Sequence, residues 1–133
     1  MLEKPSLIQF PKIGNTPLGY ISLAEKDTLP FEVKRIYWTY FTPENIERGG
    51  HAHYQLVQIL VAVAGTITVF TEMPDGRKNE FFLDSADKGV LFPNYCWHRM
   101  KYSHNAVQMC IASMAYDEED YIRDYENFKK LNV

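Results

Sequence analysis

The chain has 133 residues and a formal net charge of -3; 46% of its residues are hydrophobic and 23% are charged. This length suits one domain with its own core, and the absence of a basic excess argues against nucleic acid as a partner. With no apolar run of about 18 residues and no secretory leader, we expect no membrane association. The two cysteines, Cys96 and Cys110, are expected to be reduced thiols of a cytoplasmic protein.

The first third of the chain predicts short strands separated by turns. Residues 7–10 and 18–24 are mainly apolar, and proline, glycine and asparagine interrupt the stretch between them, which indicates two strands around a turn. Residues 31–41 carry bulky side chains at both alternating sets of positions, which predicts a long strand with two occupied faces. Arg35 and Tyr37 share one of these faces.

The middle of the chain continues the β pattern. An apolar run at 55–64 ends at Gly65, residues 66–71 alternate cleanly, and Pro74-Asp75-Gly76 is typical of a hairpin turn. Further strands are expected at 79–83, 89–93, 96–100 and 107–114. Short strands at regular spacing favour an all-β barrel or sandwich.

The C-terminal segment changes its period. Acidic residues at 117–120 are placed as at a helix N-terminus, and Tyr121, Ile122, Tyr125, Phe128 and Leu131 recur at helical spacing. We therefore predict an amphipathic helix over 117–131, packed on the outside of the barrel. Residues 1–133 form one domain in this interpretation.

The segment 48–53 is the strongest functional signal. It reads Arg48-Gly49-Gly50-His51-Ala52-His53. Two histidines two apart on a strand face the same side, where they can hold a metal or serve as base and orienting partner. The glycines allow the backbone to turn sharply near a ligand. A structural alternative is a pair of hydrogen-bonded interior histidines with no chemical role.

These residues carry a resemblance to the cupins. His51 and His53, followed by Gln58 and Gly65, are similar to the first cupin motif, and Gly89, Pro93 and His98 are similar to the second. The resemblance implies a double-stranded β-helix, or jelly-roll, barrel with its site inside the barrel mouth.

Within the cupins, the chain most resembles the bacterial dTDP-4-keto-6-deoxyglucose 3,4-ketoisomerases of sugar-nucleotide biosynthesis. The similarity covers about residues 17–131, and its specific parts are the Arg-Gly-x-His-Ala-His string at 48–53, Trp97-His98-Arg99-Met100 and the stretch 120–130. The family often has Arg or Tyr just before the glycine of the first hairpin strand, where this chain has Leu18.

The resemblance implies conversion of a dTDP-linked 4-keto-6-deoxyhexose to its 3-keto isomer, with no metal or other cofactor. The reaction moves a proton from C3 through an enediol(ate) to C4. Neutral imidazole, with a usual pKa of about 6.5, suits that transfer, and a phenol can donate to the developing oxyanion. We therefore expect His51 to be the base, Tyr37 to donate to the sugar oxygens, and His53 to orient His51 or shuttle the second proton.

Other candidates concern substrate binding. Arg48, Arg35 and Lys101 are candidates for the pyrophosphate, because cationic side chains pair with phosphate oxygens. Tyr20, Trp38, Tyr95 and Trp97 are all candidates for the wall behind the nucleotide base, and His98 is a candidate for a contact to the sugar. The resemblance also implies a homodimer with exchanged N-terminal strands, and residues 7–10 are compatible with pairing on a partner's sheet edge.

Three alternatives remain open from the sequence. A metal-dependent cupin would supply a carboxylate near position 58, where this chain has Gln58, a weaker ligand, although three histidines alone can bind zinc. A sugar-nucleotide 3,5-epimerase would leave the keto group at C4. A non-catalytic sugar-nucleotide-binding module would not depend on His51.

Overall fold

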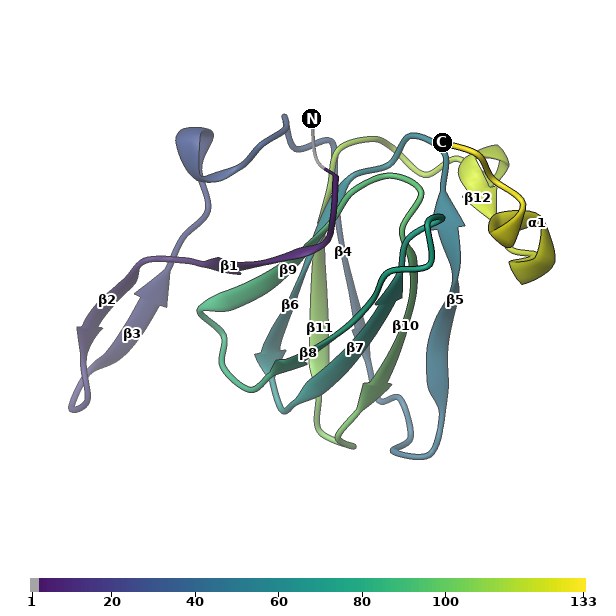
Figure 1. The fold of residues 1–133 in the computed structure, drawn as a ribbon. Helices are drawn as coiled ribbons and strands as arrows, with labels where there is room; N and C mark the ends of the chain where they lie inside the picture. Colours follow the sequence, from purple (N-terminus) through teal and green to yellow (C-terminus); the bar gives the residue numbers. More distant parts are fainter. Residues whose placement is uncertain (1–2) are drawn as a thin grey trace.

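Two antiparallel five-stranded sheets face each other in the computed structural model, which describes residues 3–133 (Figure 1). In spatial order the first sheet contains β1 (Ser6–Gln9), β9 (Lys88–Phe92), β6 (Gln58–Ala64), β11 (Val107–Ala112) and β4 (Arg35–Tyr40). The second contains β12 (Tyr121–Ile122), β5 (Glu47–His53), β10 (Trp97–Tyr102), β7 (Ile67–Glu72) and β8 (Lys78–Leu83). The expected all-β jelly-roll barrel is confirmed.

Apolar side chains fill the space between the sheets. The central strand β6 is buried on both faces, which explains its unbroken apolar sequence. Its Leu60 and Ala62 belong to the cluster between the sheets, whereas Ile59 and Val61 pack under the N-terminal segment. Because strand side chains alternate, β6 supports two separate cores. None of the helices among residues 3–133 is long and apolar enough to cross a membrane.

The N-terminal strand pairs within its own chain. β1 lies antiparallel to β9, with Ser6 opposite Leu91, and Ile8 and Phe10 pack into the outer core. Residues 6–9, for which we expected pairing on a partner's sheet edge, pair with β9 of their own chain here, and exchange of this strand between protomers stays a prediction. The projecting element is instead the hairpin of β2 (Lys12–Asn15) and β3 (Gly19–Ser22), which extends away from the barrel (Figure 1).

The C-terminal segment contains a much shorter helix than expected. The predicted helix over 117–131 is replaced by a 3-10 turn, η2 (Glu118–Asp120), the strand β12 and a five-residue helix, α1 (Tyr125–Lys129). The reason is that the backbone of β12 pairs with β5. The acidic side chains cap two separate turns: Asp117 accepts from the Glu119 N–H, and Asp124 accepts from the Glu126 N–H.

The packing role expected for the C-terminal aromatic stripe is confirmed. Phe128 is fully buried, with Ala52 and Ile122, in a small core outside β5. Trp97 and Tyr125 pack against this core. The helix α1 thus covers the outer face of the strand that carries the histidines (Figure 1).

Gly49 allows β5 to approach β10 closely. Its φ is +89°, and a Cβ atom there would lie 2.8 Å from the carbonyl oxygen of His98 and 3.0 Å from the Cα of Arg99. Neighbouring Gly50 has a φ of +77°, but a Cβ atom at that position would meet only open space. A side chain at Gly50 would therefore cause backbone strain alone, whereas a side chain at Gly49 would cause backbone strain and a clash with β10.

Replacing each glycine by alanine should have unequal effects. Gly50→Ala should cost about 1–2 kcal/mol of unfolding free energy, the strain of a left-handed backbone. Gly49→Ala should cost a further 1–3 kcal/mol, about the penalty for overpacking, because β5 must move away from β10. Urea denaturation of both variants measures this difference, and equal losses would contradict the close-approach explanation.

Candidate active site

Three histidines meet at one end of the barrel interior. His51 and His53 lie on β5, and His98 lies on β10 directly opposite His51. The ring centroid of His51 lies 4.8 Å from that of His98 and 5.1 Å from that of His53, and one ligand-type nitrogen of each ring lies within 4.8 Å of the others. The prediction that His51 and His53 face one side is confirmed, and His98 completes the cluster.

His98 is held by stacking and by a backbone carbonyl. Its side chain is 2% exposed, its ring stacks on Phe92 at 4.4 Å, and its Nδ1 lies 3.0 Å from the carbonyl oxygen of Cys96. Because a carbonyl only accepts, Nδ1 carries the proton in the neutral ring. The Nε2 atom is then free to accept a hydrogen bond.

Tyr37 reaches the same interior from the opposite sheet. It lies on β4, and its hydroxyl donates to Oε1 of buried Gln58 at 2.7 Å. Burial, reinforced by nearby Cys110, raises the pKa of Tyr37 well above its usual value. Tyr37 therefore remains a protonated donor at neutral pH.

Arg35 brings a cation to the edge of this interior. Its guanidinium lies 5.0 Å from the ring centroid of Tyr37 and 5.7 Å from that of Tyr116. The Nε atom is buried without a hydrogen-bond partner among residues 3–133. A buried N–H donor without an acceptor is costly, so Arg35 is suited to an anionic or carbonyl oxygen of a ligand.

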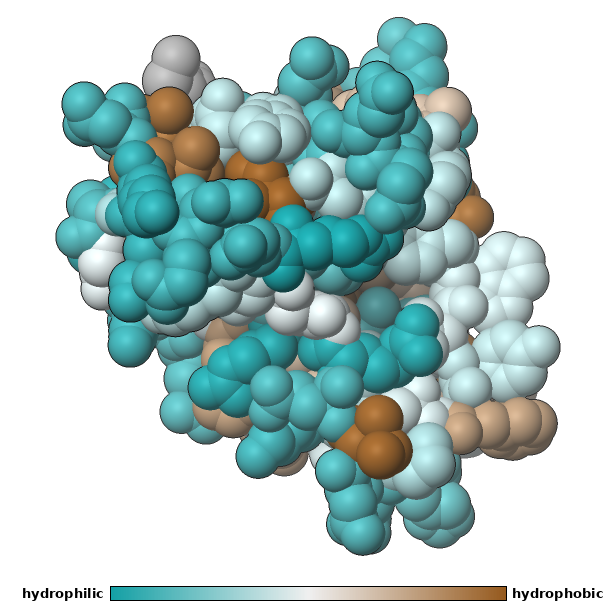
Figure 2. Space-filling view, turned by 90° about the vertical axis from the view of Figure 1, so that its right-hand side faces the viewer, coloured by the Kyte–Doolittle hydropathy of each residue, from teal (hydrophilic) through white to brown (hydrophobic). Residues whose placement is uncertain are grey.

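The C-terminal segment supplies residues that the sequence analysis did not assign to the site. The Tyr121 ring centroid lies 4.4 Å from that of His53 and 5.0 Å from that of His51. The Arg123 guanidinium lies 4.1 Å from the Tyr121 ring and pairs with Glu118 at 2.8 Å. Buried Asp120 and Ile122 alternate with Tyr121 and Arg123 in the structure. This strand alternation covers only four residues, which is too short to predict a strand from the sequence. Figure 2 looks onto the side of the barrel that carries β5 and this segment, and its surface is mainly hydrophilic.

Four expected site residues do not join the histidines. Trp97 and Lys101 alternate with inward-facing His98 on β10 and lie on its outer face. Arg48 is exposed and lies opposite Met100, two residues beyond His98 on β10. Tyr95 donates its backbone N–H to the His53 carbonyl at 2.7 Å, but its ring lies beside Tyr54.

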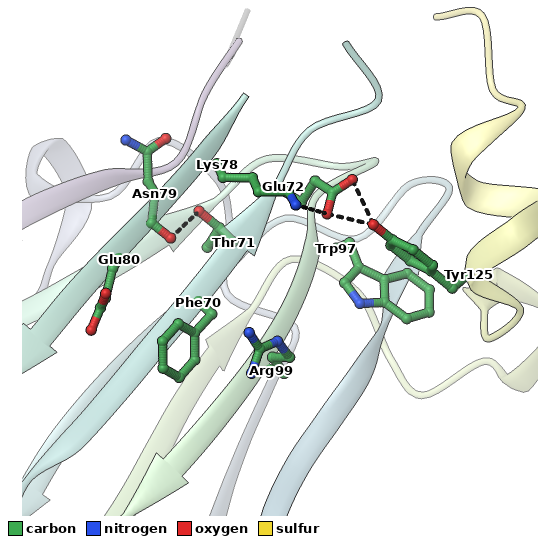
Figure 3. A pocket seen from close by; sticks show the side chains of 9 residues that line it. All are labelled: Phe70, Thr71, Glu72, Lys78, Asn79, Glu80, Trp97, Arg99 and Tyr125. Carbon is green, nitrogen blue, oxygen red and sulfur yellow. Dashed lines mark hydrogen bonds and ion pairs between the residues drawn. The ribbon is translucent and has the colours of Figure 1, made fainter. Parts of the chain in front are cut away.

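Trp97 instead lines a separate outer pocket of about 400 Å³. Figure 3 shows Trp97 beside Tyr125, whose hydroxyl donates to Glu72 at 2.8 Å. At its other end, the Arg99 guanidinium lies 4.2 Å from the Phe70 ring centroid. The pocket lies where α1 attaches to the outside of the second sheet.

The electrostatic environment keeps the three imidazoles neutral. Burial, followed by the neighbouring His98 and His53, lowers the pKa of His51 to about 2. Burial and then His98 lower the pKa of His53 to about 3, and burial lowers that of His98 to about 4. The site therefore presents neutral rings, which can accept protons or coordinate a metal.

The three histidines form the metal-ligand set found among residues 3–133. Neutral imidazoles are suitable zinc ligands. Gln58, at the place of the carboxylate in metal-binding cupins, already accepts the Tyr37 hydrogen bond. The side chains thus offer three nitrogen ligands and no carboxylate from position 58.

Comparison with known proteins identifies a family. Residues 3–133 match the family described as FdtA: WxcM-like, C-terminal. The curated TDP-4-oxo-6-deoxy-alpha-D-glucose-3,4-oxoisomerase of Aneurinibacillus thermoaerophilus is 39% identical over 126 residues, which cover 93% of this chain and 89% of that protein.

Solved structures show the same fold at high similarity. QdtA, a sugar 3,4-ketoisomerase from Thermoanaerobacterium thermosaccharolyticum solved with TDP, has a TM-score of 0.90 at 30% identity, covering 97% of this chain and 94% of that chain. A histidine-to-asparagine mutant of the same enzyme, solved with TDP-4-keto-6-deoxyglucose, has a TM-score of 0.89 at 30% identity with the same coverage.

The buried neutral histidines should make the fold sensitive to mild acid. In the unfolded chain the imidazoles take up protons near pH 6.5. In the folded chain their pKa values are about 2 to 4, so the rings stay unprotonated under mild acid. The unfolded state therefore binds more protons below pH 6.5, and the unfolding free energy should fall as the pH drops from 7 to 5.

Chemical denaturation at several pH values measures this slope. The double variant His51→Gln/His53→Gln should have a shallower slope, and His104→Gln, at an exposed turn position, should keep the wild-type slope. A wild-type stability that stays constant from pH 7 to 5 would contradict the prediction.

Proposed function

The chain belongs to the FdtA family of WxcM-like domains, and on that premise we propose that it is a TDP-4-keto-6-deoxyglucose 3,4-ketoisomerase. The observation that carries this function is the cluster of His51, His53 and His98 in the barrel interior, into which the Tyr37 phenol also projects from the opposite sheet. Its relatives include a curated 3,4-oxoisomerase and a ketoisomerase solved with the 4-keto sugar nucleotide.

The reaction exchanges a carbonyl and an alcohol between neighbouring carbons. In the proposed mechanism His51 removes the proton from C3, the electron pair forms the C3–C4 double bond, and negative charge develops on the C4 oxygen. Tyr37 turns its single hydroxyl proton from Gln58 to that oxygen and donates a hydrogen bond to it. The imidazolium of His51 then returns a proton to C4 as the C3 hydroxyl gives up its proton, which passes to the C4 oxygen, and becomes the ketone.

A low pKa is compatible with the role of His51. A base must be neutral before it acts, and burial keeps His51 neutral throughout the ordinary pH range. The weak basicity of a neutral ring in a buried site is offset when the enediolate beside it carries negative charge, which stabilises the imidazolium. The proposed site needs no metal for these steps.

Two cations are placed for the charged parts of the substrate. Arg35 has its buried, unsatisfied Nε facing the site edge, and Arg123 lies at the surface over Tyr121. We assign Arg35 to a sugar or enediolate oxygen and Arg123 to the diphosphate, with His98 as a sugar contact. Arg48, Lys101, Trp97 and Tyr95 lie apart from the histidines, so we keep Arg48 and Lys101 as candidates for the pyrophosphate and Trp97 and Tyr95 as candidates for the nucleotide base.

A dimer is part of this proposal. β4 is an edge strand, and Ile36, Trp38 and Tyr40 on its outer face are 52%, 63% and 57% exposed. The projecting β2–β3 hairpin also exposes apolar side chains, namely Ile13, Leu18, Tyr20 and Ile21. Exposed apolar patches of this kind indicate an interface, and we propose that the hairpin of each protomer pairs with the β4 edge of its partner by strand addition.

The proposed location is the cytoplasm. Cys96 and Cys110 are both free and buried. Free thiols are typical of reducing compartments.

Proton NMR with TDP-4-keto-6-deoxyglucose in deuterated buffer tests the activity. Loss of the C3 proton signal, deuterium at C4 and a 3-keto product that forms equally with a chelator present are the expected results. Exchange at C3 and C5 with the keto group still at C4 would indicate a 3,5-epimerase. Binding without exchange would indicate a binding module, and loss of exchange on chelation would indicate a metal-dependent enzyme.

Two substitutions test the assigned residues. His51→Asn should lower kcat by at least about 100-fold, in line with the loss of a general base. Tyr37→Phe should lower kcat by about 100-fold or more, as does removal of one oxyanion donor. The control His104→Asn changes a histidine outside the site and should stay near wild type. Wild-type kcat in both test variants would end the assignment.

Sedimentation equilibrium tests the dimer. The wild-type chain should sediment at twice the 15.5 kDa protomer mass, and Trp38→Glu should shift it toward the monomer because a charge would be buried in the interface. Phe82→Glu is the matched control, since Phe82 is 57% exposed on the other sheet. A monomeric wild type, or equal effects of both variants, would argue against the proposed interface.

A further inference from the structure

Asp120 is a buried carboxylate that the proposed mechanism does not use. It lies at the end of η2 and is 7% exposed. Its Oδ1 accepts the backbone N–H of Gln55 at 2.8 Å, and its Oδ2 accepts that of Leu56 at 3.1 Å. Burying a carboxylate is unfavourable unless hydrogen bonds compensate, so these contacts fix the position of Asp120.

The same carboxylate faces His53. Oδ2 of Asp120 lies 3.5 Å from Nδ1 of His53, and both side chains are almost completely buried. The geometry of this contact falls short of a hydrogen bond, and Nδ1 has no other hydrogen-bond partner among residues 3–133. A small rotation of the ring would complete an Nδ1–H donation to the carboxylate.

The backbone next to Asp120 also contacts the segment that carries His53. The Asp120 carbonyl accepts the N–H of Tyr54 at 3.0 Å, and Tyr121 pairs with His53 across β12 and β5. The Tyr121 ring then packs on the His53 ring, with centroids 4.4 Å apart. Asp120 therefore approaches His53 through its side chain and through the backbone pairing of β12 with β5.

His53 does not orient His51 in this arrangement. Their rings meet edge to face, at 80° and 5.1 Å, and no hydrogen bond joins them within the described part of the chain. Of the two roles open to His53, orienting His51 or shuttling a proton, the geometry favours the second.

We propose that Asp120 is a positioning residue that keeps the proton of neutral His53 on Nδ1 and leaves Nε2 free to accept a proton from the sugar. A carboxylate only accepts hydrogen bonds, so it selects this tautomer, as an aspartate does for a catalytic histidine in serine proteases. The inference rests on the proposed ketoisomerase function.

This assignment completes the proton balance of the reaction. His51 carries the carbon-bound proton from C3 to C4. The second proton must move from the C3 oxygen, which becomes the carbonyl, to the C4 oxygen, which becomes the hydroxyl. Nε2 of His53 accepts that proton from the C3 oxygen and donates it to the C4 oxygen, and His53 ends in its starting state. Asp120 stabilises the transient imidazolium by its negative charge.

Asp120→Asn tests the role in the full-length enzyme. The amide keeps one oxygen for the backbone N–H groups but can donate to Nδ1, which favours the opposite His53 tautomer. We expect kcat to fall by about 100-fold or more and KM to change by less than about threefold. This loss lies between that for removing a hydrogen-bond partner of a metal-bound histidine and that for forcing the wrong tautomer on the histidine of a serine-protease triad. Asp117→Asn is the matched control, because Asp117 caps the same turn from an exposed position.

Two further measurements separate positioning from a purely structural role. Nitrogen-15 NMR of the histidine rings should show His53 protonated on Nδ1 in the wild type and on Nε2 in Asp120→Asn. In a His53→Asn background, Asp120→Asn should change kcat less than about twofold, because its effect passes through His53. Losses that multiply in the double variant would show a structural role and overturn the proposal.

The outcomes also distinguish this inference from the function it rests on. An active wild type with His53 protonated on Nε2, or an Asp120→Asn variant with wild-type kcat, would overturn the role of Asp120 alone. A wild type without isomerase activity would end the proposed function, and the tautomer measurement needs no activity. If Asp120→Asn does not fold, the kcat of Asp120→Glu and the tautomer of His53 in the wild type test the role of Asp120 instead.

Discussion

The site depends on the pairing of β5 with a strand on each of its edges. β10 binds one edge and places His98 opposite His51, while β12 binds the other and places Tyr121 opposite His53. Gly49 makes the first pairing possible because any side chain there would meet the β10 backbone. The relative positions of the four rings follow from these two sets of backbone hydrogen bonds.

Burial of these rings has an energetic consequence. Imidazoles in a dry barrel interior remain neutral, which suits proton acceptors but lowers their basicity. The neighbouring Tyr37 is kept protonated by the same burial. The one barrel interior therefore holds both neutral acceptors and a neutral donor, the combination that proton transfer next to a carbonyl needs. The same burial should make the fold less stable in mild acid, because the imidazoles take up protons in the unfolded chain but not in the folded one.

The outer surface has a different organisation. Trp97 and Lys101 belong to the outer face of β10, where Trp97 helps to attach α1. Their residue types favoured a substrate contact, but strand alternation separates them from His98, because neighbouring residues on a strand face opposite sides. Tyr37 and Arg35, by contrast, are two residues apart on one face of β4, and their side chains lie together as the sequence predicted.

Strand periodicity, which acts over a few residues, was enough to predict an all-β barrel or sandwich and the shared face of His51 and His53. The jelly-roll barrel and the candidate roles of His98 and Tyr37 came from the resemblance to the 3,4-ketoisomerase cupins. The path of residues 117–124 depended instead on long-range pairing, which forms a turn and a strand there and brings Asp120, Tyr121 and Arg123 to the site. The helical spacing of apolar residues over 121–131 correctly indicated a packed face, since Ile122, Tyr125, Phe128 and Leu131 share one small core. It was overridden at Tyr121 and Ile122 because the free edge of β5, some 70 residues earlier in the chain, offered the backbone hydrogen bonds that local sequence patterns do not encode.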